Sequence, residues 1–273
     1  MRVLLAAALL LPLAGCVDAP SGPSGPGAAG DARTLPWDLS QCRYVVGWSE
    51  ADPAVLQRNL PGGFTVEAGT PLGLPLAPAE RAIVGTEAFE CASGSGLAGT
   101  VEPMLYGSIW IPVTPPAELN PDGIEEVYYK VDVLVPDAPR REAFLAMGLP
   151  VANGSIAWGT SPVPDGTAAR MSVEGVGDFG FQLASPRSVQ AGEGREFMEV
   201  TPAGEDGAGG FAVWRSTFSW DGGSYVQGRG FIDWPADHWV VEAIGTPRAP
   251  ASFHAGTWSF RGNVTLPRAL PLE

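Results

Sequence analysis

Lys130 is the residue of this chain that most clearly could take part in a chemical reaction. It is the only lysine in the sequence. It lies in Val127–Pro136, where apolar and polar residues alternate as they do in a half-buried strand. Side chains alternate along a strand, so one face of this segment carries the candidate ligand-lining residues Glu126, Tyr128, Lys130 and Asp132. That face points either to solvent or into the polar interior of a barrel.

Two roles for Lys130 follow from these two environments. Inside a barrel, burial would lower the pKa of the lysine and allow the neutral amine to form a Schiff base with a carbonyl compound. On a solvated face, the lysine would form an ion pair with a neighbouring carboxylate, and we favour this simpler role. The sequence therefore assigns no catalytic residue.

Two other motifs contain residue types that carry chemistry elsewhere. Gly175–Gly180 matches the dinucleotide-binding pattern GxGxxG, but the following residues continue a strand, so the motif predicts a tight turn. Asp233–Trp239 contains two carboxylates, one histidine and two indoles. Such residues can form the rim of a site that stacks on a sugar or contacts a metal ion. We favour a strand–turn–strand corner there, with the tryptophans in the core.

Common catalytic signatures are absent from the sequence. It contains no GxSxG, HExxH or CxxC motif, and His254 lies in a strand-like segment without an evident partner. We therefore predict neither a metal nor another cofactor. Whether the protein is an enzyme stays open, and we favour a protein that is not one.

Composition limits the class of protein. The chain has 273 residues, which fits one all-β domain, and 45% of them are hydrophobic, which is enough for a substantial core. Its net charge is −14, which argues against binding to nucleic acid, because phosphates require a basic surface.

The N-terminus has the features of an export signal. Residues 1–15 contain one arginine and a short apolar run, and we interpret them as a signal peptide. Leu13–Cys16 reads Leu-Ala-Gly-Cys and resembles the lipobox of bacterial lipoproteins. That resemblance implies cleavage before Cys16 and its acylation with chains such as palmitate. The alternative is an ordinary signal peptide that ends near a cysteine.

If the lipobox is functional, the protein is exported and anchored in membrane lipid through acylated Cys16, at a membrane surface of the cell envelope. By the same resemblance, Val17 in place of an aspartate after the cysteine permits outer-membrane sorting in a host with two membranes, and the sequence leaves the choice of membrane open. Residues 16–36 comprise the lipidated cysteine and a Gly/Ser/Pro tether that cannot bury a core, and 37–273 form a single β-rich domain.

The remaining cysteines, Cys42 and Cys91, both lie in strand-like segments of an exported domain, where disulfides persist. We expect them to form a disulfide that links two strands. Two free buried thiols are the alternative.

Turn and periodicity signals predict a mainly β fold, a single antiparallel β-barrel or sandwich domain with two short helices. Asp52-Pro53 and Asp137 begin the helices, and no helix is expected from Ser155 onward. Asp221–Ser224 predicts a hairpin between the strands Phe211–Trp220 and Tyr225–Trp234. The predicted strands before the second half of the chain are Cys42–Ser49, Phe64–Ala68, Arg81–Ala92, Met104–Val113 and Val127–Pro136. Ala168–Gly175 and Phe179–Ser185 are predicted to form a hairpin. The remaining predicted strands are Arg195–Thr201, Phe211–Trp220, Tyr225–Trp234, Trp239–Ile244 and Phe253–Leu266.

The order of elements between Arg43 and Trp158 resembles the acetoacetate decarboxylase-like fold. The matching motifs are Leu60-Pro61-Gly62-Gly63, Arg141-Glu142 and Gly148-Leu149-Pro150. In that family a Schiff-base lysine with a cationic neighbour follows the last motif, whereas this chain has Val151 and Ala152 there. The resemblance thus implies the fold without the decarboxylation chemistry.

Three functional hypotheses follow. The leading one is a lipid-anchored barrel that binds a small apolar or amphipathic ligand without catalysis, since ligand sites favour the mouths of barrels. The second is an acetoacetate decarboxylase-like enzyme with displaced catalytic residues. The third is a structural or adhesive envelope protein, which would expose tryptophans in a large apolar patch and contain no pocket.

Overall fold

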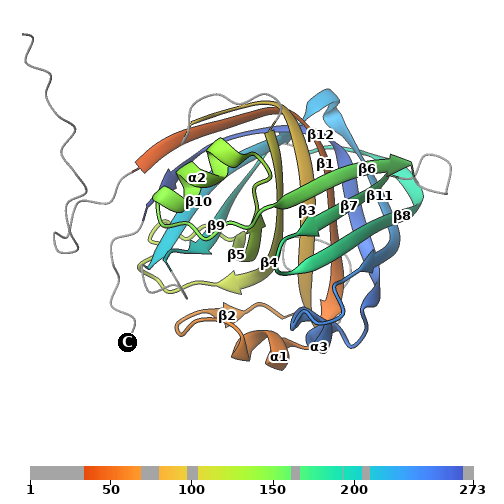
Figure 1. Ribbon diagram of the computed structural model, residues 1–273, viewed down its shortest axis with the longest axis horizontal. Coiled ribbons are helices and arrows are strands. Elements are labelled where there is room, and N and C mark those ends of the chain that lie inside the picture. Colours follow the sequence, from red (N-terminus) through yellow and green to blue (C-terminus); the bar gives the residue numbers. More distant parts are fainter. Residues whose placement is uncertain are drawn as a thin grey trace, which may run out of the picture. The chain divides into compact units, whose positions relative to one another are not determined.

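Seven strands close into a barrel in the order β1-β3-β4-β5-β9-β10-β12, and β12 pairs back onto β1 (Figure 1). The neighbouring strands are antiparallel except for β5 and β9, which are parallel. Their bounds are Thr34–Ala51 (β1), Ala82–Gly96 (β3), Met104–Thr114 (β4), Val127–Leu134 (β5), Arg195–Pro202 (β9), Phe211–Trp220 (β10) and Arg248–Thr265 (β12). The predicted mainly β fold is confirmed, and the structure is a closed barrel.

The computed structural model describes residues 34–68, 80–96, 104–160, 167–192, 194–204 and 210–266. The predicted signal peptide, Cys16 and most of the tether lie outside the described residues. No helix in the described ranges is long and apolar enough to span a membrane.

Further strands extend the sheet beyond the barrel. From β12 the sheet continues through β11 (Ser224–Asp233), β8 (Gly177–Gln190), β7 (Thr167–Val173) and β6 (Gly154–Thr160), and the short β2 (Thr65–Val66) pairs with β4. The predicted hairpin of β7 and β8 is confirmed, and the GxGxxG segment supplies its turn. Met171 of β7 packs against Gly107 of β4, where a Cβ atom would lie only 2.3 Å from its sulfur.

The predicted hairpin of Phe211–Trp220 with Tyr225–Trp234 is wrong. Instead, β10 and β11 follow one another along the same partner, β10 beside residues 258–265 and β11 beside residues 248–255 of β12. Asp221–Gly223 forms a 3-10 turn between them, with φ of 79° at Gly222 and 69° at Gly223. Because β12 is 18 residues long, it can pair with both strands, and the two glycines produce an offset rather than a reversal.

The described residues contain three short α-helices where two were predicted. α1 (Pro53–Arg58) and α2 (Ala138–Ala146) begin as expected, because the carboxylates of Asp52 and Asp137 accept hydrogen bonds from the first-turn amides. α3 (Val240–Ile244) corrects both the expected strand Trp239–Ile244 and the expected absence of helices after Ser155. Asp233–Trp239 therefore leads into a helix and not into a second strand.

The reason for α3 lies in its ends and its buried face. Gly245 follows with φ of 87°, the left-handed conformation that ends many helices, and its amide donates to Val241. Val240 and Ala243, three positions apart, are both buried. In a segment of five residues, a helical spacing of buried side chains cannot be distinguished from the alternation of a short strand.

Apolar side chains bury on both faces of the barrel wall. The outer cluster includes Val45, Ile111 and Phe253 and is covered by residues of β6, β7, β8, α1 and α3. The inner cluster includes Phe89 and Trp258, and Phe144 and Leu149 join it. The Phe144 ring of α2 stacks on Trp214 with 5.8 Å between ring centroids. This packing fills part of the interior and leaves the rest to the candidate site.

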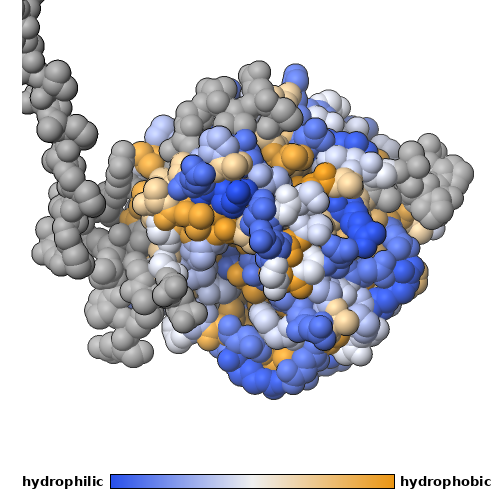
Figure 2. Space-filling model, in the orientation of Figure 1, coloured by the Kyte–Doolittle hydropathy of each residue, from blue (hydrophilic) through white to orange (hydrophobic). Residues whose placement is uncertain are grey.

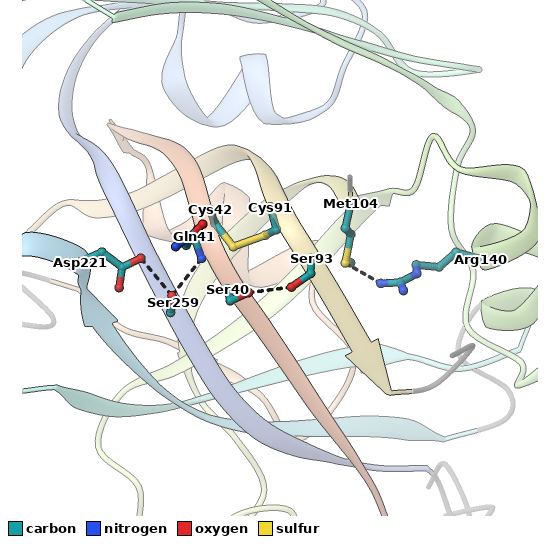
Figure 3. The surroundings of a disulfide bond; sticks show 9 residues. All are labelled: Ser40, Gln41, Cys42, Cys91, Ser93, Met104, Arg140, Asp221 and Ser259. Atoms are coloured by element: carbon teal, nitrogen blue, oxygen red, sulfur yellow. Dashed lines mark hydrogen bonds between the residues drawn. A yellow bond between two sulfur atoms is a disulfide. The ribbon is translucent and has the colours of Figure 1, made fainter. Parts of the chain in front are cut away.

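The structure joins Cys42 of β1 to Cys91 of β3 by a disulfide, between residues that are register partners (Figure 3). Beside it, the hydroxyls of Ser40 and Ser93 lie 2.7 Å apart. The backbone amide of Gln41 donates to Ser259 of β12 at 3.0 Å. The bridge thus ties two wall strands at an irregularity of β1, which has φ of 51° at Gln41.

Reduction of the Cys42–Cys91 bridge is expected to lower the free energy of unfolding by about 4 kcal/mol, because it releases a loop with a sequence separation of 49 residues. Urea unfolding of the oxidised and reduced protein measures this difference. The C42A/C91A variant is the control, since its stability should not respond to the reducing agent. Equal stability of the oxidised and reduced protein would contradict the expectation.

Candidate functional site

The barrel contains a partly open cavity of about 270 Å³. All seven barrel strands contribute side chains to its lining, and β11 adds two more. Most of the lining side chains are aromatic: Trp37, Tyr44, Trp48, Phe89, Tyr106, Trp110, Tyr128, Phe197, Phe218, Trp220, Tyr225, Trp258 and Phe260. This is the lining expected of a small-molecule site, a largely apolar surface with a few polar groups.

Glycines on neighbouring strands make room for the rings. A Cβ atom at Gly85 of β3 would lie 2.1 Å from the Trp110 ring, so the indole lies over bare backbone. At Gly256 of β12, a Cβ atom would lie 3.1 Å from the Trp220 ring, which stacks on Tyr225 with 4.7 Å between centroids. The approach at Gly85 requires glycine, and the approach at Gly256 leaves little room for a side chain.

Lys130 lies inside the barrel, with 1% of its side chain exposed. Its ammonium group contacts carboxylate oxygens of Glu87 from β3 and Glu199 from β9, the latter at 2.6 Å. It also donates to the hydroxyl of Ser108 from β4 at 2.8 Å. Side chains from four strands of the barrel therefore meet at one buried ion cluster, which we call the Lys130 cluster: Lys130, Glu87, Glu199 and Ser108.

The electrostatics of the Lys130 cluster keep the lysine charged. Burial alone would lower the pKa of Lys130, but the carboxylates of Glu199 and Glu87 outweigh that effect and raise its pKa above the ordinary value. The ammonium has three N–H donors, and the three oxygens around it use all of them. The ammonium form of Lys130 is therefore favoured, and its N–H donors are occupied by the neighbouring oxygens.

The two carboxylates of the Lys130 cluster differ in how many of their oxygens have a hydrogen-bond or ion-pair partner. One oxygen of Glu87 contacts Lys130 and accepts from Ser108 at 2.6 Å, and the other accepts from the Tyr44 hydroxyl at 3.1 Å. Glu199 contacts Lys130 with one oxygen, and its other oxygen has no hydrogen-bond partner within the described part of the chain. Burial raises the pKa of Glu199, against the opposing effect of Lys130.

The more exposed part of the cavity lining carries its own polar pairs. Arg195, half-exposed, donates to Glu126 at 2.9 Å. The amide of Gln227 lies 3.2 Å from Nε2 of His254. Burial, with a smaller effect of Arg195, lowers the pKa of His254 to about 4, so this imidazole is neutral at neutral pH. No three His, Cys, Asp or Glu side chains of the described segments are grouped to hold a metal ion.

The structure brings three of the four predicted lining residues to the cavity: Glu126, Tyr128 and Lys130. Asp132 is not among them. The β4–β5 register shifts between Lys130 and Asp132, with Val131 as the extra residue, and this bulge turns Asp132 away from the cavity. Asp132 instead accepts from His238 at 3.0 Å. The simpler role for Lys130 correctly included an ion pair, but the solvated face was wrong.

Sequence reasoning missed Glu87, Glu199 and most of the aromatic lining. Glu87 and Phe89 alternate in β3, as do Phe197 and Glu199 in β9, so each pair could have been assigned to one strand face. Nothing local shows which faces meet. Val151, where the resembled family has its lysine, is buried with Phe144 and Leu149 and does not line the cavity.

No family model and no curated protein matches the chain. Solved structures do. The enduracididine biosynthesis enzyme MppR complexed with pyruvate has a TM-score of 0.50 and 13% identity over 91% of this chain and 96% of its own. An acetoacetate decarboxylase-like enzyme from Sphingomonas wittichii RW1 has a TM-score of 0.48 and 15% identity, over 89% of this chain and 94% of its own.

Acetoacetate decarboxylase from Legionella pneumophila has a TM-score of 0.49 and 12% identity, over 89% of this chain and 92% of its own. Proteins of the fold that the sequence motifs resemble are thus among the solved structures similar to this chain. At such identities the likeness concerns the fold alone.

Replacing Lys130 by methionine is expected to lower the free energy of unfolding by about 3–5 kcal/mol, because it leaves two buried carboxylates without their cation. Urea unfolding at pH 7 measures the loss. The K130M/E87Q/E199Q variant is the matched control, since it removes the uncompensated charges and should regain most of the stability. A K130M protein as stable as the wild type would show that the Lys130 cluster is not formed.

Proposed function

We propose that this protein is a lipid-anchored protein of the cell envelope whose barrel binds one small amphipathic ligand without converting it. The observation that carries the proposal is the aromatic cavity of about 270 Å³ inside the barrel, with the Lys130 cluster in its wall. Its volume is close to the lower limit of roughly 300 Å³ for small-molecule sites.

The anchor is supported by sequence alone. A short apolar segment, a small-residue stop and Cys16 follow one another as in lipoproteins, and the Gly/Ser/Pro residues after the cysteine would hold the barrel away from the bilayer. More than one acyl chain gives stable anchoring, because each buried CH₂ group contributes about 0.8 kcal/mol.

The absence of turnover is supported by the state of Lys130. A Schiff base requires a neutral amine, and the two carboxylates of the cluster favour the ammonium form. The resembled family activates its lysine with a cationic neighbour, whereas the neighbours of Lys130 are anionic. The charge around Lys130 is thus opposite in sign to the charge around the catalytic lysine of the resembled family.

Native mass spectrometry of the full chain purified from membranes tests the anchor and the ligand together. We expect a covalent mass that corresponds to cleavage before Cys16 and acylation of that residue. We also expect one non-covalent ligand that is released at higher collision energy. Protein purified in the same way from a Cys16→Ser strain is the control for the acyl mass.

A chain without acyl groups would reject the anchor. A barrel that carries no ligand, and that takes up none from a lipid and metabolite extract, would reject the binding function.

An acetoacetate decarboxylase-like activity is the second candidate, and the placement of Lys130 in the cavity favours it. Borohydride reduction in the presence of acetoacetate or pyruvate tests this candidate directly, because any lysine adduct must be at Lys130. We expect no adduct at pH 7. K130M is the control for labelling of the chain N-terminus, and a Lys130 adduct would replace the binding function with this activity.

The adhesive alternative has less support. None of the nine tryptophans is exposed, and among the described residues the exposed large hydrophobic side chains are Leu145 and Phe231. On the face shown in Figure 2, hydrophobic residues form separate groups between hydrophilic ones. The face shown does not present the large apolar patch expected of an adhesive protein.

A further inference from the structure

The chemical class of the ligand can be read from the polar groups that line the cavity. The charged lining side chains are Glu87, Glu126, Glu199, Lys130 and Arg195. Arg195 and Glu126 form an ion pair with each other. The buried Lys130 cluster sets two carboxylates against one ammonium, so the cavity wall carries an excess of negative charge.

Hydrogen bonding at the Lys130 cluster shows the same imbalance. Lys130 has no N–H left for a ligand, because Glu87, Glu199 and Ser108 accept from it. Glu199 has one oxygen without a hydrogen-bond partner among the described residues, and its side chain lines the cavity. An anionic ligand would find no donor at the lysine and would face an unneutralised carboxylate. A ligand with N–H donors or positive charge would complete the site.

The walls favour the same class of ligand. Aromatic faces attract cations, and the attraction reaches about 2 kcal/mol where the cation is desolvated. Tyr106 already faces a cation, since the Lys130 ammonium lies 5.9 Å from its ring centroid. Trp110 and Tyr128 pack edge to face at 4.9 Å on the same stretch of wall, and Tyr44 and Trp258 do so at 5.0 Å.

We infer that the barrel binds a small organic cation, an amine or quaternary ammonium compound with an apolar group, whose charge lies between the aromatic rings and the free oxygen of Glu199. This inference rests on the proposed binding function and names its ligand class. The cavity volume of about 270 Å³ limits the ligand to a small molecule. The net charge of −14 attracts such cations to the protein.

Three probes of similar size test the inference on the full chain, kept free of detergent. Phenyltrimethylammonium is the cation, tert-butylbenzene is its neutral isostere, and phenylacetate is an anion. Quenching of tryptophan fluorescence reports binding, since Trp37, Trp48, Trp110 and others line the cavity. We expect the cation to bind at least tenfold more tightly than the isostere, and the anion to bind most weakly.

The Glu199→Gln variant should weaken binding of the cation by about 10- to 100-fold, the range for a hydrogen bond or contact with a charged group, and leave the isostere unchanged. Glu242→Gln is the matched control, because it removes the same charge from an exposed position on α3, and its affinities should equal those of the wild type.

An isostere or anion that binds as tightly as the cation would overturn the inference and leave the binding function standing. If none of the three probes binds and native mass spectrometry finds no ligand, the binding function itself fails. The comparison of probes on the wild-type chain decides the ligand class even if Glu199→Gln does not fold.

Discussion

The burial of one ammonium group between two carboxylates is the constraint on which this structure depends. Lys130, Glu87 and Glu199 come from β5, β3 and β9, and a charge buried without its partners would cost several kcal/mol. The parallel ladder between β5 and β9 contains only three register pairs, and Tyr128 pairs with Glu199. A shift of one residue would turn Glu199 out of the barrel. We interpret the ion pair as the contact that fixes this short ladder.

The same constraint separates fold from chemistry. Strands that close a barrel present a ring of inward side chains, and the properties of a lysine in that ring depend on what surrounds it. Here the neighbours hold the proton on the amine and occupy all of its donors. The surroundings of the lysine, and not the fold, set its protonation state, and function has to be argued from the site.

Local sequence signals predicted much of the fold. The predictions were wrong where the structure depends on pairing between strands that are distant in the sequence. The caps at Asp52 and Asp137 and the β7–β8 turn are each encoded within a few residues, and the cysteine pair was predicted from its strand-like segments together with the expectation of export. The offset between β10 and β11 depends on β12, which lies later in the chain, and the Val131 bulge that turns Asp132 away depends on pairing with β4. The carboxylate partners of Lys130, Glu87 and Glu199, lie 43 and 69 positions away, so its burial could not be predicted from its own strand.

Stability alone does not account for the barrel interior. Replacing a buried ion cluster by apolar side chains of similar volume is often neutral or stabilising, and a filled interior would also remove the cavity. This barrel instead keeps a cavity beside the Lys130 cluster and leaves one oxygen of Glu199 without a hydrogen-bond partner in the described structure. Glu87, which has partners at both oxygens, behaves as part of the scaffold. The two glutamates thus differ in the hydrogen bonds that the barrel provides, and the proposed ligand class is inferred from this difference.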